Sequence, residues 1–312
     1  MNGRLGFARL AFALAVTIAA AHPPLLRAAP PSAASAGSTG GPYVMPRSEV
    51  RHMRSDAGGD YLVYIAWPQQ PPPPEGYPVL YLLDGSESFA IAAEYQNRLG
   101  GYAGLAPGIV VGIGYPDASR RNFDYTPAVP EGVELVAGMG ATGGAEPFLD
   151  FLADKVIPEV EAEFSVDAGR RTLAGYSLGG LLTLQALFKH PDLFRTYVAS
   201  SPSIWYGDKR LLSMLPGFAA RLRVVPSRRR LLLSAGEYEQ SPPPGRERDP
   251  SWLRIADLSR RARMIDNARE LANSLRSAPM DVKFRVAPGE THATGNWPAI
   301  RDALQLAFGN KP

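Results

Sequence analysis

The chain has 312 residues, of which 45% are hydrophobic and 20% are charged, so it can form one large α/β domain or two small ones and is not disordered throughout. Its formal charge of +3 comes from three arginines in the first 29 residues, and the balanced charge of the remainder gives no reason to expect nucleic-acid binding. The absence of cysteine excludes a thiol nucleophile, a disulfide framework and a lipoprotein anchor.

Residues 1–29 have the features of a signal peptide. Arginines precede an apolar run, Leu10 to Ala21, and small residues suited to cleavage occur at 19–21 and 28–29. The run is too short to span a bilayer comfortably, and no other segment is long and apolar enough. A buried N-terminal helix is the alternative. We predict an exported, periplasmic protein that is not inserted in the membrane after leader removal; the cleavage point stays open.

The rest of the chain divides into a lead-in and one folded domain. Residues 30–45 are rich in Ala, Ser, Gly and Pro and predict a flexible segment, and the domain comprises 46–312. Apolar or alternating runs predict strands at 61–67, 79–85, 108–116, 171–176, 194–201, 229–236 and 282–288. Helical spacing predicts helices at 89–99, 145–164 (kinked or divided at Pro158), 178–190, 255–277 and 297–308. This alternation predicts a doubly wound, mostly parallel sheet with helices on both faces.

The segment Gly175-Tyr176-Ser177-Leu178-Gly179 matches the pattern G-x-S-x-G between a predicted strand and a predicted helix. In that context the pattern indicates a nucleophile elbow, in which a strained serine projects at the carboxyl edge of the sheet. Side chains at the two glycine positions would collide with neighbouring backbone. The alternative is a glycine-bounded turn with an inert serine. We predict Ser177 as the nucleophile.

A serine nucleophile needs a base, and the chain has four histidines. His22 lies in or beside the leader, His52 is in a charged first strand, and His190 ends the helix that follows Ser177. His292 remains, in a loop between the last strand and the last helix, on the edge where active-site loops gather. The order serine, acid, histidine is also that of α/β hydrolases.

The sequence leaves alternatives open for the acid and for the second oxyanion donor. Glu237 and Glu239 both follow the predicted strand 229–236, and a Ser-His dyad without an acid is a third possibility. The N–H of Leu178 supplies one oxyanion donor, and Gly85 or Ser86 supplies the second. We expect Asp84 to brace that loop by accepting backbone hydrogen bonds.

Further motifs accompany this constellation: YPVLYLLDG, GIGYP, DYTP, TLAGYSLGGL, ASSPSIWY and GETH. Together they resemble the esterase D branch of the α/β hydrolases over about residues 45–308, and within it the periplasmic esterases of enterobactin and salmochelin. The resemblance implies an α/β-hydrolase fold and hydrolysis of siderophore trilactone esters through an acyl-enzyme. It implies Ser177 as nucleophile, His292 as base, Glu239 as acid and Arg121 near the substrate. One departure is Tyr176, where histidine is frequent.

A pocket for a bulky tris-catecholate would use flat aromatic faces and a cation. Trp205, Tyr206, Tyr125 and Tyr115 are candidates for the former and Arg121 for the latter, although aromatic residues in such loops also serve packing.

Two other functions remain open: an esterase for feruloyl, acetyl or S-formylglutathione-like substrates, and a non-catalytic binding protein on a hydrolase scaffold. We expect no cofactor and no metal, because the sequence has no phosphate-binding loop, dinucleotide fingerprint or metal-ligand spacing. The oligomeric state stays undetermined.

Overall fold

The computed structural model describes residues 41–309, apart from 103, 134, 136–137 and 226–227. The predicted leader at 1–29 and most of the predicted lead-in at 30–45 lie outside the described residues. Residues 41–45 contain no helix or strand, and the first strand begins at Ser48.

The described residues form one eight-stranded sheet with the order β1-β2-β4-β3-β5-β6-β7-β8. β1 and β2 pair antiparallel, β2 pairs antiparallel with β4, and all other neighbours are parallel. The strands are β1 (Ser48–Arg54), β2 (Asp60–Ala66), β3 (Tyr77–Leu82), β4 (Ile109–Gly114), β5 (Val166–Tyr176), β6 (Thr196–Ser200), β7 (Arg230–Gly236) and β8 (Asp281–Ala287). The predicted mostly parallel α/β architecture is confirmed.

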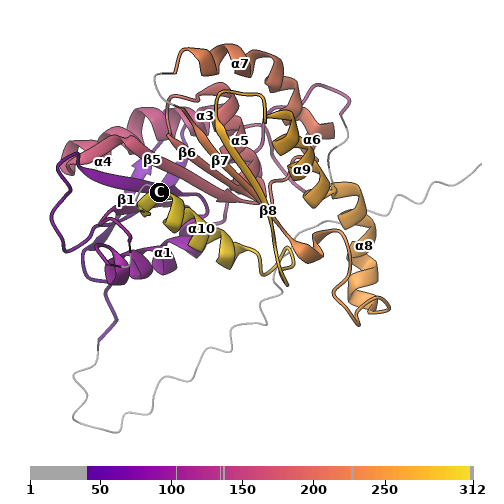
Figure 1. Cartoon of the computed structure of the whole chain (residues 1–312), viewed down its shortest axis with the longest axis horizontal. Coiled ribbons are helices and arrows are strands. Elements are labelled where there is room, and N and C mark those ends of the chain that lie inside the picture. Colours follow the sequence, from indigo (N-terminus) through magenta and orange to yellow (C-terminus); the bar gives the residue numbers. More distant parts are fainter. Residues whose placement is uncertain (1–40, 103, 134, 136–137, 226–227, 310–312) are drawn as a thin grey trace, which may run out of the picture.

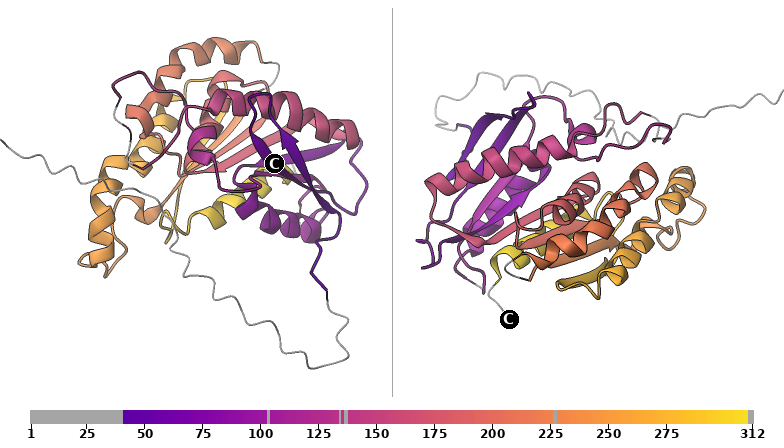
Figure 2. Two further views of the ribbon diagram at one scale, coloured as in Figure 1. Left: turned by 180° about the vertical axis from the view of Figure 1, so that it is seen from behind. Right: turned by 90° about the horizontal axis from the view of Figure 1, so that it is seen from above.

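Helices cover both faces of this sheet (Figures 1 and 2). One face is covered by α1 (Gly85–Leu99) and α10 (Asn296–Phe308), and the other by α3 (Ala145–Phe151), α4 (Ile157–Glu163), α5 (Leu178–Lys189), α7 (Leu215–Arg223) and α9 (Met264–Ser274). The remaining helical segments are α2 (Arg121–Asp124), η1 (Leu152–Val156), α6 (Tyr206–Lys209), η2 (Arg210–Met214), η3 (Glu237–Glu239) and α8 (Pro250–Ala262).

Side-chain alternation in the strands produces two separate apolar cores. Along β3, Val79 and Tyr81 face the α5 side, whereas Leu80 and Leu82 face α1 and α10. Successive side chains of a strand point to opposite faces, so a central strand must be apolar throughout to bury both. This is the physical reason that the continuous apolar runs in the sequence identified the central strands.

Two predicted elements differ notably from the structure, and the division of a third was predicted correctly. The strand predicted to end at Gly85 ends at Leu82, because α1 already begins at Gly85. The helix predicted over 255–277 is divided into α8 and α9 at Arg263, whose φ of 45° interrupts a right-handed helix. Pro158 divides its helix as predicted: a π-helical turn precedes α4, with the proline in its first turn.

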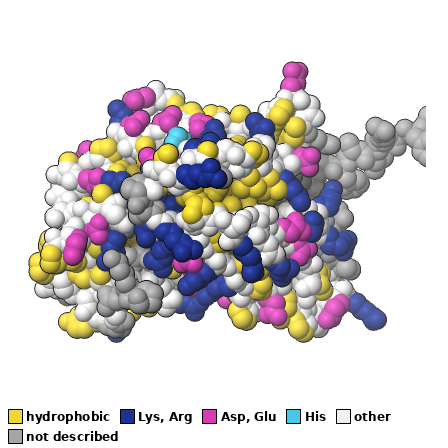
Figure 3. Space-filling model, turned by 45° about the horizontal axis from the view of Figure 1, so that its top comes forward, with side chains coloured by type: hydrophobic (Ala, Val, Ile, Leu, Met, Phe, Trp, Pro, Cys, Tyr) yellow, Lys and Arg dark blue, Asp and Glu magenta, His cyan; other side chains and the backbone are white. Residues whose placement is uncertain are grey.

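The surface is mixed in charge. On the face shown in Figure 3, Lys and Arg side chains surround an apolar area, and acidic side chains lie mainly towards the margins. Within the part of the chain that the structure describes, no helix combines the length and apolar character needed to cross a membrane.

Candidate active site

Ser177 lies on a sharp bend between the end of β5 and the start of α5. Its φ of 58° and ψ of −116° are strained for a residue with a side chain. A Cβ at Gly175 would come within 2.3 Å of the Gly179 carbonyl oxygen, so glycine is required there. A Cβ at Gly179 would meet nothing closer than 3.4 Å, so the predicted collision holds for the first glycine and is wrong for the second.

His292 approaches this serine from the loop between β8 and α10. Its Nε2 atom lies 3.1 Å from Ser177 Oγ, although 115 residues separate them in the chain. Of the other histidines, His52 is exposed in β1 and His190 is the C-cap of α5, while His22 lies outside the described residues. Only His292 among the described histidines is therefore placed to exchange a proton with Ser177.

The two acid candidates have different surroundings. Glu239 is buried, and its Oε2 lies 3.5 Å from His292 Nδ1, in ion-pair range but outside hydrogen-bond geometry. Neither atom has a hydrogen-bond partner among the described residues, so a small rotation would join them. Glu237 is exposed, and its Oε2 accepts a hydrogen bond from Gly289 N at 2.7 Å. Glu239 is therefore the carboxylate that faces His292, whereas Glu237 contacts the backbone of the loop that carries the histidine.

Several donors hold Glu239 in its charged form. Burial raises the pKa of this carboxyl, but His292, the Ser201 hydroxyl at 2.5 Å and the Gly236 N–H at 2.9 Å outweigh burial and lower the pKa below its ordinary value. A carboxylate fixed in this way stabilises the imidazolium that forms when His292 takes a proton.

Two serines of the segment 199–203 also belong to the site, and the sequence analysis did not single them out. Ser201 has a φ of 44°, and its hydroxyl is the donor to Glu239. The hydroxyl of buried Ser203 lies 3.4 Å from Ser177 Oγ, and its N–H donates to the Ser177 carbonyl. The run ASSPSIWY contains both serines, but it entered the sequence analysis only as one of the motifs that resemble the esterase family.

The oxyanion donors named from the sequence are compatible with the structure and stay a prediction. Leu178 N is at the start of α5, where the first N–H groups have no intrahelical acceptor and the helix dipole favours negative charge. Gly85 and Ser86 begin α1 in the same way. The cavity beside Ser177 is lined by Asp84 and Glu87, whereas Leu178, Gly85 and Ser86 are not among its lining residues.

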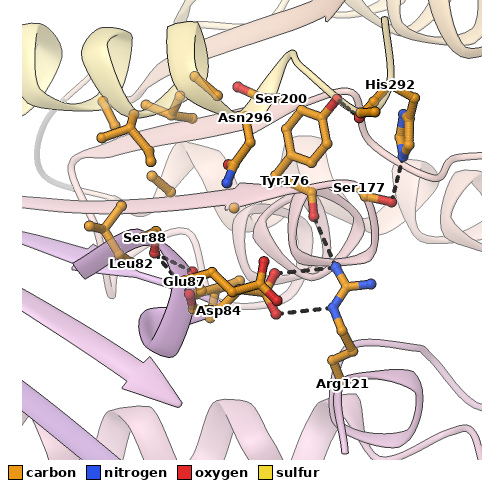
Figure 4. A pocket seen from close by; sticks show the side chains of 18 residues that line it. Leu82, Asp84, Glu87, Ser88, Arg121, Tyr176, Ser177, Ser200, His292 and Asn296 are labelled. Atoms are coloured by element: carbon orange, nitrogen blue, oxygen red, sulfur yellow. Dashed lines mark hydrogen bonds and ion pairs between the residues drawn. The ribbon is translucent and has the colours of Figure 1, made fainter. Parts of the chain in front are cut away.

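Asp84 has a different role from the one predicted. Its carboxylate binds Arg121 through two contacts, Oδ1 to Nε at 3.0 Å and Oδ2 to Nη2 at 3.2 Å. Arg121 Nη2 also donates to the Tyr176 carbonyl oxygen at 3.3 Å, which places the guanidinium beside the elbow (Figure 4). Burial opposes the charge of Arg121, but Asp84 outweighs it and keeps the pKa above its usual value. The site therefore holds a fixed, permanently charged arginine.

Two of the aromatic substrate contacts predicted from the sequence are wrong, and those of Trp205 and Tyr115 stay predictions. Tyr125 and Tyr206 are fully buried and present no face to a ligand. Tyr125 instead uses its hydroxyl to accept a hydrogen bond from Asp84 N at 3.0 Å. Trp205 and Tyr115 are half-buried and pack against the core, and neither lines the cavity at Ser177.

A cavity of about 440 Å³ opens at Ser177 and lies between the sheet edge, α1 and α10 (Figure 4). Its lining includes the polar side chains of Arg121, Glu87 and Asn296, none of which is buried. Its buried lining includes a group of small and apolar side chains, called the deep wall below, namely Leu82, Ala174, Val198, Ala299, Ile300 and Ala303. Among the described residues, no group of three or more His, Asp or Glu side chains could hold a metal ion.

Comparison with known proteins identifies the family. The Esterase family model, described as Putative esterase, matches residues 55–282. The chain belongs to this esterase family.

This esterase is similar to two curated proteins named as siderophore esterases. It is 36% identical over 255 residues to the ferri-bacillibactin esterase BesA of Bacillus subtilis, covering 77% of this chain and 81% of BesA. It is 37% identical over 242 residues to the siderophore triacetylfusarinine C esterase of Aspergillus fumigatus, covering 69% and 80%.

A solved structure extends this similarity to the fold. The siderophore hydrolase EstB of Aspergillus nidulans superposes on the esterase with a TM-score of 0.77 at 30% identity, over 88% of this chain and 99% of EstB. The α/β-hydrolase fold implied by the sequence motifs is confirmed.

Proposed function

We propose that this esterase is an exported serine hydrolase that cleaves the ester bonds of a catecholate siderophore, such as enterobactin in its iron-free or ferric form. The observation that carries the proposal is the 3.1 Å separation between Ser177 Oγ and His292 Nε2 on a strained elbow. Strain of this kind persists only where the surrounding structure maintains it.

In the proposed mechanism, Ser177 Oγ attacks the ester carbonyl carbon while His292 Nε2 takes its proton. The tetrahedral intermediate is stabilised by the Leu178 N–H and a donor from the start of α1, Gly85 or Ser86. His292 then returns the proton to the leaving alkoxide, and an acyl-Ser177 ester remains. Water activated by the same histidine hydrolyses that ester. Glu239 holds the imidazole ring and offsets its positive charge in each half-reaction.

The cavity supports entry of a single arm of the substrate. Its volume of about 440 Å³ is within the range for sites that bind a small ligand, which would accommodate one catecholate arm. The rest of the molecule would stay outside, where Arg121 presents its charge to catecholate or carbonyl oxygens. The siderophore substrates named for the curated relatives support this class of substrate.

Two experiments test the function. A fluorophosphonate should label the wild-type protein and fail to label Ser177→Ala, because only an activated serine reacts. Incubation with iron-free enterobactin, ferric enterobactin and triacetylfusarinine C, followed by chromatography, should yield ring-opened products from the catecholates. Unlabelled wild type would favour a non-catalytic binding protein. Hydrolysis of feruloyl or acetyl esters without siderophore cleavage would favour a general carboxylesterase.

The leader is tested separately. Residues 1–29, fused to a reporter that is active only in the periplasm, should direct its export, and loss of Arg4 and Arg9 should reduce it. A reporter that stays in the cytoplasm would overturn the exported location and leave the hydrolase proposal intact.

A further inference from the structure

Tyr176, the residue immediately before the nucleophile, contacts the base and the acid as well. Its hydroxyl donates to the His292 carbonyl oxygen at 2.8 Å, as Figure 4 shows. Its ring lies 5.2 Å from the imidazole ring, at an interplanar angle of 38°. The same hydroxyl is 3.5 Å from Glu239 Oε1. One side chain of the elbow therefore contacts both partners of Ser177.

The other contacts of the histidine loop lie before or after His292. Glu237 accepts from Gly289 N, and Glu290 O accepts from Tyr238 N at 2.8 Å. Thr291 N donates to Thr294 Oγ1 at 3.0 Å, within the loop itself. These bonds leave the main chain at His292 to be held by Tyr176, which is the last residue of β5.

We propose that Tyr176 is a positioning residue for the base of this esterase, an inference that rests on the function proposed above. The hydroxyl fixes the loop through the His292 carbonyl, and the ring limits rotation of the imidazole. Because Tyr176 and Ser177 are consecutive, any movement of the elbow carries the base with it. A displacement of about 1 Å between catalytic groups can cost on the order of a hundredfold in rate, so such coupling has kinetic value.

The proposal also accounts for Gly295 at the end of the loop. A Cβ there would lie 2.8 Å from the Tyr176 hydroxyl oxygen, 3.2 Å from the Thr291 carbonyl oxygen and 3.4 Å from the nearest tyrosine ring carbon. The φ of −65° at Gly295 is one that alanine adopts freely, so the backbone conformation does not demand glycine. The Tyr176 hydroxyl is therefore the nearest obstacle to a side chain at Gly295, and the Thr291 carbonyl oxygen is the second.

The first test replaces Tyr176 with phenylalanine, which keeps the ring and removes the hydroxyl. We expect kcat to fall about tenfold with KM nearly unchanged, and the rate of fluorophosphonate labelling to fall by the same factor. The matched control is Tyr197→Phe. Tyr197 is buried and donates to the His190 carbonyl at 3.0 Å, at the far end of α5, about 18 Å along the helix from Ser177. The Tyr197→Phe variant loses the same kind of hydrogen bond, from a tyrosine hydroxyl to a histidine carbonyl, and should keep wild-type kinetics.

The second test is a double-mutant cycle with Gly295→Ala. In the wild-type background the new Cβ displaces the hydroxyl, and we expect a loss of activity of about tenfold. In the Tyr176→Phe background the 3.2 Å contact with the Thr291 carbonyl oxygen is the closest that remains, so the same change should cost clearly less than tenfold and the two effects are not additive.

The outcomes separate this inference from the proposed function. An active wild type with an unimpaired Tyr176→Phe, or equal kinetic losses in Tyr176→Phe and Tyr197→Phe, would overturn the role of Tyr176 and leave the hydrolase intact. A wild type that neither reacts with the fluorophosphonate nor cleaves any ester would overturn the proposed function itself. Additive losses in the cycle would contradict the assignment of Gly295 to the hydroxyl.

Discussion

Replacement of Glu239 by glutamine tests the acid that the sequence left open. The amide keeps the shape of the side chain, and its oxygen can still accept from Ser201 and the Gly236 N–H. It removes the negative charge beside His292, and its NH₂ group faces Nδ1, which favours the tautomer that cannot accept the Ser177 proton. We expect a large loss of kcat.

The size of the expected loss of kcat follows from the distance between the His292 ring and the Glu239 carboxylate. Coulomb's law with an effective dielectric constant of about 20 gives about 5 kcal/mol for unit charges at the 3.5 Å between Nδ1 and Oε2. The histidine side chain is 35% exposed, so solvent screens part of this attraction and about 3–4 kcal/mol remains. That energy corresponds to a decrease in kcat of about 10²–10³-fold.

The assay is steady-state hydrolysis of a nitrophenyl ester, with Glu237→Gln as the control. Glu237 is exposed, and the amide oxygen of glutamine can still accept from Gly289 N, so we expect at most a twofold change. If Glu239→Gln retained more than a third of wild-type kcat, the charge would contribute little and the site would be a Ser-His dyad. A large loss in Glu237→Gln alone would reverse the assignment.

Three further predictions concern binding, the cavity and acid stability. Arg121→Lys should raise KM for a siderophore ester about tenfold, with the rate of fluorophosphonate labelling nearly unchanged, because lysine cannot form the two-point contact with Asp84; an unchanged KM would remove Arg121 from the substrate site. Ala303→Leu should fill the deep wall of the cavity and lower kcat/KM for aromatic esters at least tenfold while sparing an acetate ester; equal effects on both substrates would place the substrate elsewhere. Because the folded-state pKa of Glu239 is lowered, its stabilising contribution is present above its ordinary pKa of 4.5 and is lost as the pH falls through the lowered value. Thermal melts should therefore show wild-type Tm falling more steeply than that of Glu239→Gln between about pH 5 and about pH 3, and parallel curves would contradict the shift.

The sequence by itself determined the strands, their alternation with helices and the elbow, and it predicted the base. Each of these signals is local: an apolar run marks a strand buried on both faces, and glycine and proline mark turns and helix ends. His292 could be found by elimination because each of the other histidines had a position that explained it. Ser177 precedes His292 in the chain, which is the order found in α/β hydrolases. Both residues follow parallel strands, and the carboxyl ends of such strands lie at one edge of the sheet.

Only the tertiary structure decided the pairings between side chains. Glu237 and Glu239 are two residues apart in one short helical turn, where they point in different directions, so composition could not choose between them. The Asp84–Arg121 pair and the burial of Tyr125 depend on how α2 folds against the end of β3, which no local pattern encodes. The contact of Tyr176 with His292 likewise joins segments more than a hundred residues apart. Periodicity reports which face of an element is buried, whereas the partner met on that face is set by the packing of the whole chain.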